Sequence, residues 1–233
     1  MRKLTGLCFL TAILLASSAN AQSMFIDQGD PSTMSVTAGG AFGGGLYGGG
    51  LNLAYTYRGV FDVGLDTSFS HFKSGRYNNL NAFDFAPFIN WQIVRTDADE
   101  TPVSVTALFA FEKVLYGNNG PVAAPDGWGM VLGATAYRKF EIGTSMLLIP
   151  ELVVAYDFMY TRFYSNALDQ NGPTVGDSST ISAPPSESKH SVRVLAKANL
   201  GFKSGDHVLT VTPYGGYQGF FGTVVGLTVG YVF

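Results

Sequence analysis

The chain has 233 residues and a formal net charge of −3, and it is poor in charged residues (13%) but rich in aromatic residues (14%) and glycine (29 residues). About 25% of the residues of an ordinary globular protein are charged, so this composition argues against a molecule whose whole surface faces water. The acidic balance excludes a basic surface for nucleic acid, and the single cysteine, Cys8, excludes an internal disulfide.

The first 21 residues have the three parts of a secretory signal peptide. Arg2 and Lys3 precede an apolar run over residues 7–16, and Ala19-Asn20-Ala21 is a small-residue cleavage site. The apolar run is too short to cross a bilayer as a helix. We therefore expect residues 1–21 to be cleaved from an exported protein.

After a lead-in at residues 22–33, ten stretches of the remaining chain alternate between apolar and polar residues. Such alternation is typical of strands that face lipid on one side and a polar interior on the other. The stretches span residues 34–43, 46–58, 61–70, 83–93, 103–112, 127–140, 148–160, 192–202, 207–218 and 222–233. We expect a β-bulge at each of Pro87, Pro150 and Pro213, because proline cannot donate a ladder hydrogen bond.

The links between these stretches alternate in length. Short links lie at 58–60, 95–102, 141–144 and 203–206, and longer ones at 73–80, 117–126 and 165–189. Barrels of the outer membrane have short periplasmic turns and longer external loops. The sequence therefore predicts an all-β, up-and-down antiparallel transmembrane barrel over residues 34–233, with ten strands and with both termini in the periplasm. Eight strands is the alternative, if the glycine-rich first hairpin or the stretch around Pro213 is not part of the barrel. Residues 22–33 are expected to be a loose periplasmic segment.

The final stretch places Val225, Leu227, Val229, Tyr231 and Phe233 on one face. Together with the series of alternating stretches, this pattern resembles the bacterial outer-membrane β-barrel proteins of the small OmpA/OmpX-type class. The resemblance implies a location in the outer membrane and contact with its lipid. It also implies that Val229, Tyr231 and Phe233 form a signal for the barrel-assembly machinery.

Aromatic residues near the strand ends predict two girdles at the membrane surfaces. The predicted outer girdle comprises Trp128, Tyr156, Phe158 and Tyr160, and the inner one comprises Trp91, Phe140, Phe202, Tyr231 and Phe233.

Eight charged residues fall on the face that should line the barrel interior. They are Asp62, Asp66, Asp84, Glu112, Glu151, Asp157, Arg193 and Lys197. The interior of so small a barrel is hardly wider than its side chains. The charges therefore predict either a salt-bridged polar plug, which we favour, or a charged constriction that selects solutes. We expect Asp157 and Lys197 to form an ion pair.

The sequence contains few candidates for catalytic or metal-binding residues. His71, His190 and His207 are the only histidines, and His71 has the parity of a lipid-facing residue. We predict no catalytic residue, cofactor or metal site, and a non-enzymatic envelope protein with a narrow or plugged lumen. A small passive diffusion channel is the alternative, and a lipid-modifying enzyme is less favoured. The loop at 165–189 is a candidate for binding an external ligand.

Overall fold

A computed structural model describes residues 22–27, 29–43, 45–73, 81–96, 101–117, 122–165, 187–219 and 222–233. The predicted signal peptide and most of the 165–189 loop lie outside the described residues, so those expectations remain predictions.

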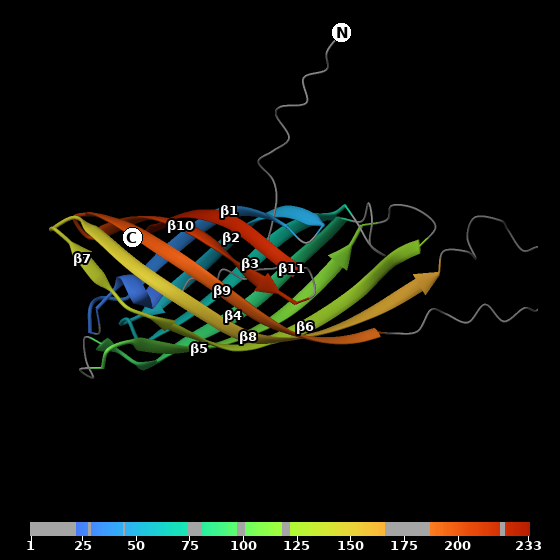
Figure 1. The fold of residues 1–233 in the computed structure, drawn as a ribbon, viewed down its shortest axis with the longest axis horizontal. Helices are drawn as coiled ribbons and strands as arrows, with labels where there is room; N and C mark the ends of the chain where they lie inside the picture. Colours follow the sequence, from blue (N-terminus) through green and yellow to red (C-terminus); the bar gives the residue numbers. More distant parts are fainter. Residues whose placement is uncertain are drawn as a thin grey trace, which may run out of the picture.

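Across the described residues the chain forms one antiparallel sheet that closes on itself (Figure 1). A 3₁₀ helix, η1 (Gln22–Phe25), comes first. The strands are β1 (Thr33–Gly43), β2 (Leu46–Tyr57), β3 (Phe61–Phe72), β4 (Asn81–Val94), β5 (Ser104–Tyr116), β6 (Val122–Tyr137), β7 (Phe140–Ile142), β8 (Met146–Ser165), β9 (Glu187–Ser204), β10 (His207–Gln218) and β11 (Gly222–Val232).

Except for β6 and β7, each strand pairs with its successor, and β1 pairs with β11 to complete the ring. The short β7 continues β6 after a break at Arg138 and Lys139, and both of these strands pair with β8. Counted this way, the barrel has ten strands, as the sequence predicts, and the eight-strand alternative is excluded.

Exposure alternates along the strands with a period of two, as the sequence predicts. In β4, exposed and buried residues alternate along most of the strand, so that Phe85 and Trp91 face outward while Asp84 and Asn90 face the interior. The outward residues form an apolar band that suits the hydrocarbon region of a bilayer. No helix in the described part of the chain is long and apolar enough to cross a membrane.

The predicted bulges at the three prolines are wrong. Leu65 pairs with Pro87 and Pro150 pairs with Ala198 in regular register, and the register is the same on both sides of Pro213. The missing N–H removes a local hydrogen bond without adding a residue to the strand. The register shifts instead lie between Gln92 and Val94, and between residues 123 and 126.

Both ends of the described chain lie at the end of the barrel that carries the short turns. Met34 and Phe233 exchange backbone hydrogen bonds of 3.0 and 2.9 Å. The turns between β2 and β3 and between β9 and β10 contain Gly59 and Gly205, whose φ angles of 63° and 62° suit glycine. In Figure 1 the C-terminus, η1 and β7 gather at the left, and we call this the inner end of the barrel.

The expected loose lead-in is wrong for its first residues. Ser23, Met24, Phe25 and Ile26 are all buried, with exposed fractions of 7% or less. They pack against inward-facing apolar residues at the inner end, namely Tyr137, Leu147, Ile149, Val208 and Val232. Burial of these apolar side chains supplies the free energy that orders the segment. We call residues 22–27 the N-terminal seal.

Aromatic side chains cluster where the girdles were predicted. Trp128 lies near Phe158 and Tyr160, with ring centroids 5.2 and 5.8 Å apart, toward the outer end. At the inner end Tyr231 lies 6.0 Å from Phe233, and His207 stacks on Tyr231 at 5.5 Å. Such rings suit the membrane–water interface.

Candidate functional site

The polar interior of the barrel holds all eight charged residues singled out from the sequence. Each has an exposed fraction of 8% or less, and each lies on the inward face of its strand. Six of them belong to three contact groups, stacked from the inner end toward the outer end, and Asp66 and Asp84 lie outside these groups.

The group at the inner end is centred on Asp62 of β3. Its carboxylate accepts hydrogen bonds from the Ser23 backbone N–H (3.1 Å), the Ser23 hydroxyl (3.0 Å) and the Thr56 hydroxyl (2.6 Å). Gln92 Nε2 donates to Ser23 Oγ at 2.6 Å, and the Tyr137 hydroxyl donates to Gln92 Oε1 at 2.9 Å. A polar chain therefore runs from β3 through the N-terminal seal to β4 and β6.

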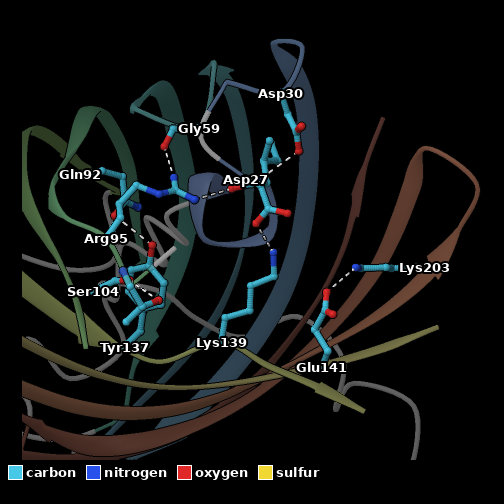
Figure 2. Close-up of polar contacts among 12 residues, drawn as sticks. Asp27, Asp30, Gly59, Gln92, Arg95, Ser104, Tyr137, Lys139, Glu141 and Lys203 are labelled. Carbon is cyan, nitrogen blue, oxygen red and sulfur yellow. Dashed lines mark hydrogen bonds and ion pairs between the residues drawn. The ribbon is translucent and has the colours of Figure 1, made fainter. Parts of the chain in front are cut away.

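Two cationic side chains, Arg95 and Lys139, bind the rest of the seal (Figure 2). The buried guanidinium of Arg95 donates to the backbone oxygens of Gly59 and Ile26, the latter at 2.8 Å. Lys139 forms an ion pair of 2.7 Å with Asp27 at the surface. Arg95 thus joins the turn after β2 to the seal. These hydrogen bonds hold the seal across the inner mouth of the barrel.

The middle group joins β8, β9 and β10. Glu151 and Lys197 lie directly opposite each other, and their charged atoms are 3.2 Å apart. Asn199 Nδ2 donates to Glu151 Oε2 at 2.8 Å, and Asn199 Oδ1 accepts from the Thr212 hydroxyl at 2.9 Å. The amide therefore extends the ion pair to a third strand.

The third group is centred on Arg193 of β9. Its guanidinium makes a bidentate contact with Asp157 of β8, at 3.2 Å from Nε and 2.9 Å from Nη2. The same Nη2 lies 3.9 Å from Glu112 of β5. Because all three side chains are buried, the charges interact in a medium of low dielectric constant.

The predicted pair between Asp157 and Lys197 is wrong. The register of β8 and β9 sets Asp157 opposite Ser191, while Lys197 faces Glu151. Glu151 and Asp157 are six residues apart, which is roughly 20 Å along a strand. Asp157 therefore pairs with Arg193, and Lys197 pairs with Glu151.

Asp66 of β3 and Asp84 of β4 lie at similar heights along the barrel axis, on neighbouring strands. Asn52 Nδ2 donates to Asp66 Oδ1 at 2.5 Å. Among the described residues, Asp66 Oδ2, Asp84 Oδ1 and the hydroxyls of Ser68 and Ser70 are buried without a hydrogen-bond partner. Buried polar atoms of this kind generally require water. This side of the lumen is therefore polar and rich in carboxylates.

Apolar layers separate the polar groups. One layer lies toward the outer end and comprises Leu46, Phe72, Ala82, Val114, Tyr116 and Met159. Two others lie at mid-height, one around Phe88 and Leu108 and one around Leu195 and Tyr214. Side chains therefore reach into the lumen at several levels between the seal and the outer end.

The three histidines lie outside this network. His71 contacts Asn81, with Nδ1 2.7 Å from Oδ1, and His190 bonds to the Tyr156 hydroxyl. His207 stacks on Tyr231 at the inner end. The partners of His71 and His190 are an amide and a phenol rather than a serine hydroxyl. In the described part of the chain, no group of three or more His, Cys, Asp or Glu side chains is arranged to hold a metal ion.

The residues of the predicted assembly signal face outward, with Val229 and Tyr231 on β11 and Phe233 directly after it. Val229, Tyr231 and Phe233 have exposed fractions of 45%, 39% and 48%. Their strand is paired on both sides, with β1 and β10. Their role in assembly remains a prediction.

Sequence reasoning missed the seal and several neutral residues of the network. The parity of the strands marks Asn52, Thr56 and Asn199 as inward-facing, but it does not indicate which strand supplies their partners. Ser23 carries no such signal, because residues 22–27 have no alternating pattern.

No family model and no curated protein sequence matches the chain. Among solved structures, the translocator domain of the autotransporter NalP from Neisseria meningitidis is similar, with a TM-score of 0.53 and 14% identity, covering 92% of each chain.

Two further structures match less well. The β-domain of the Bordetella autotransporter BrkA has a TM-score of 0.46 and 11% identity, covering 88% of this chain and 99% of that domain. The attachment invasion locus protein Ail of Yersinia pestis has a TM-score of 0.39 and 13% identity, covering 87% of this chain and 97% of Ail. The similarity to the NalP translocator domain confirms the β-barrel fold of the chain, and the predicted location in the outer membrane agrees with this fold.

Proposed function

We propose that this integral outer-membrane barrel is a non-enzymatic envelope protein whose lumen is closed by its own side chains. The observation that carries the proposal is the N-terminal seal, which Asp62 and Arg95 hold across the inner mouth. A conducting pore requires a continuous water path, and the seal packs apolar side chains into that path.

The two buried ion-pair groups support the same function. Arg193 with Asp157, and Lys197 with Glu151, place long side chains inside the barrel and satisfy their charges there. The lumen would then serve to fix the barrel's shape, and exchange with the surroundings would be left to the external loops. The loop at 165–189 remains the candidate for contact with an external ligand.

A small diffusion channel is the second candidate, and one observation favours it. The unpartnered oxygens of Asp66 and Asp84, with those of Ser68 and Ser70, suit a hydrated region of the lumen. The eight charged residues comprise six carboxylates and two cations, so an open path of this kind would favour cations.

Conductance across a planar bilayer distinguishes the two functions. The refolded protein, with its insertion verified by heat-modifiable migration, is expected to be silent. Steady stepwise currents would contradict the closed barrel, and a reversal potential toward the cation equilibrium value would establish the second function. The matched variant Asp62→Ala weakens the seal. Intermittent currents from this variant alone would identify the seal as the closing element.

A further inference from the structure

The outer surface of the barrel has a hollow that none of the preceding functions uses. It has a volume of about 1100 Å³ and lies over β11, β1, β2, β3 and β4. We call it the lipid-face notch. Its centre is formed by Gly40 of β1 and Gly49 of β2, which lie opposite each other. Strands β11, β1, β2 and β3 form one row of paired, outward-facing residues. In it Leu227 of β11 lies opposite Gly40, and Phe69 of β3 lies opposite Gly49.

The notch exists because this row lacks two side chains. Neither Gly40 nor Gly49 has a positive φ, so the backbone does not require glycine at either position. The next row toward the inner end contributes Ala38, another small residue, which lies opposite Leu51. The missing side chains leave room between flanking apolar residues, and the notch lining is predominantly apolar.

The position of the notch along the strands places it in the outer half of the bilayer. Gly40 lies near the outer end of β1, and Gly49 lies near the outer end of β2. A hydrocarbon chain of an outer-leaflet lipid therefore reaches this level.

A rim that contains a cation, Lys73, lies just beyond the notch, toward the outer end. Tyr47 pairs with Phe42 of β1 and with His71 of β3, and the Tyr47 and His71 ring centroids are 5.0 Å apart. Lys73 Nζ lies 4.2 Å from the centroid of the Tyr47 ring, and the Lys73 backbone N–H donates to Gly45 O at 2.6 Å. Aromatic rings with a neighbouring lysine are suited to the headgroup level of a membrane.

We propose that the lipid-face notch and its rim form a binding site for one phosphate-bearing lipid of the outer leaflet. An acyl chain fills the space over Gly40 and Gly49, and the phosphate of the headgroup pairs with the ammonium of Lys73. The apolar lining matches hydrocarbon, while the charge of Lys73 is complementary to phosphate. A second copy of the barrel is the competing occupant of such a surface, but it would bring its own Lys73 rim to the membrane surface rather than an anionic group.

The test compares matched variants of the full mature chain in neutral phosphatidylcholine nanodiscs. The nanodiscs contain a small fraction of lipid A, either with its phosphates or after their removal. After gentle release into detergent, native mass spectrometry counts the lipid A molecules that remain bound. The double substitution Ala38→Leu with Gly40→Leu fills the notch, and Ala134→Leu enlarges an exposed, lipid-facing residue of β6 outside the notch.

The wild type should retain one molecule of the phosphorylated form. Filling the notch should reduce this retention several-fold, and Ala134→Leu should preserve it. Lys73→Gln should abolish the preference for the phosphorylated form, whereas Lys203→Gln at the inner end should leave the preference intact. Heat-modifiable migration verifies that each variant is folded.

The proposal is overturned if the notch-filling variant retains as much lipid as Ala134→Leu. It is also overturned if Lys73→Gln still prefers the phosphorylated form, or if the wild type is a dimer that the notch-filling variant converts to a monomer.

Discussion

Replacing Arg193 by leucine tests the energetics of the lumen most directly. The guanidinium contacts Asp157 at 2.9 Å and Glu112 at 3.9 Å, and the three side chains have exposed fractions of 6% or less. Leucine fills much of the same volume but leaves both carboxylates without this cation. The perturbation is therefore electrostatic rather than a loss of packing.

Removing one partner of a buried ion pair costs about 3–5 kcal/mol in free energy of unfolding. Arg193 contacts two carboxylates, so we expect Arg193→Leu to lie in the upper half of that range. Adding Asp157→Leu and Glu112→Gln should restore most of the loss, because no uncompensated charge then remains in this group. Such rescue distinguishes charge burial from a general distortion of the barrel.

Urea unfolding in lipid vesicles measures the effect, followed by the fluorescence of Trp91 and Trp128, the two tryptophans of the chain. Arg193→Lys is the matched control, since it keeps the charge but loses the bidentate geometry, and it should be intermediate. A cost below about 1 kcal/mol for Arg193→Leu is typical of exposed pairs. Such a result would refute the dry, side-chain-filled lumen at this level.

The remaining predictions concern the seal and the last strand. Asp62→Ala removes the acceptor for Ser23, so a cysteine placed by Ile26→Cys should react much faster with a thiol reagent than in the Asp62 parent, and equal rates would show that this carboxylate does not hold the seal. Tyr137→Phe deletes the hydrogen bond to Gln92 and should lower the free energy of unfolding by about 0.5–1.5 kcal/mol in urea titrations, whereas no change would show that the bond contributes nothing. Phe233→Ser should reduce the heat-modifiable fraction in isolated outer membranes, while Phe202→Ser, at another lipid-facing aromatic of the inner end, should reduce it less; equal losses would contradict a special role for Phe233.

The strands and the direction of their side chains could be predicted because both depend on local sequence. In a strand the side chains alternate, so the pattern around Asp84 or Arg193 indicates the inward face without knowledge of any partner. The ten alternating stretches then sufficed for the barrel and its strand number.

Partners across the lumen could not be predicted in the same way. Which residue faces Asp157 depends on the register between β8 and β9, and the 165–189 loop between these strands leaves that register undetermined by sequence. The sequence therefore favours Lys197, whereas the partner of Asp157 in the structure is Arg193. The N-terminal seal could not be predicted for a related reason. The burial and hydrogen bonds of Ser23 and Met24 depend on residues of β3, β6 and β8 that are distant in the sequence.

The seam between β1 and β11 constrains every other register in the barrel. Met34 bonds to Phe233 only if the offsets of all the successive strand pairs add up to one fixed total. A slip of two residues in any hairpin would have to be cancelled by an opposite slip elsewhere, or the ring would not close. The tilt and the diameter of the barrel are therefore collective properties, and an insertion within one strand is accommodated locally as a bulge, like the one between Gln92 and Val94, rather than by sliding a strand.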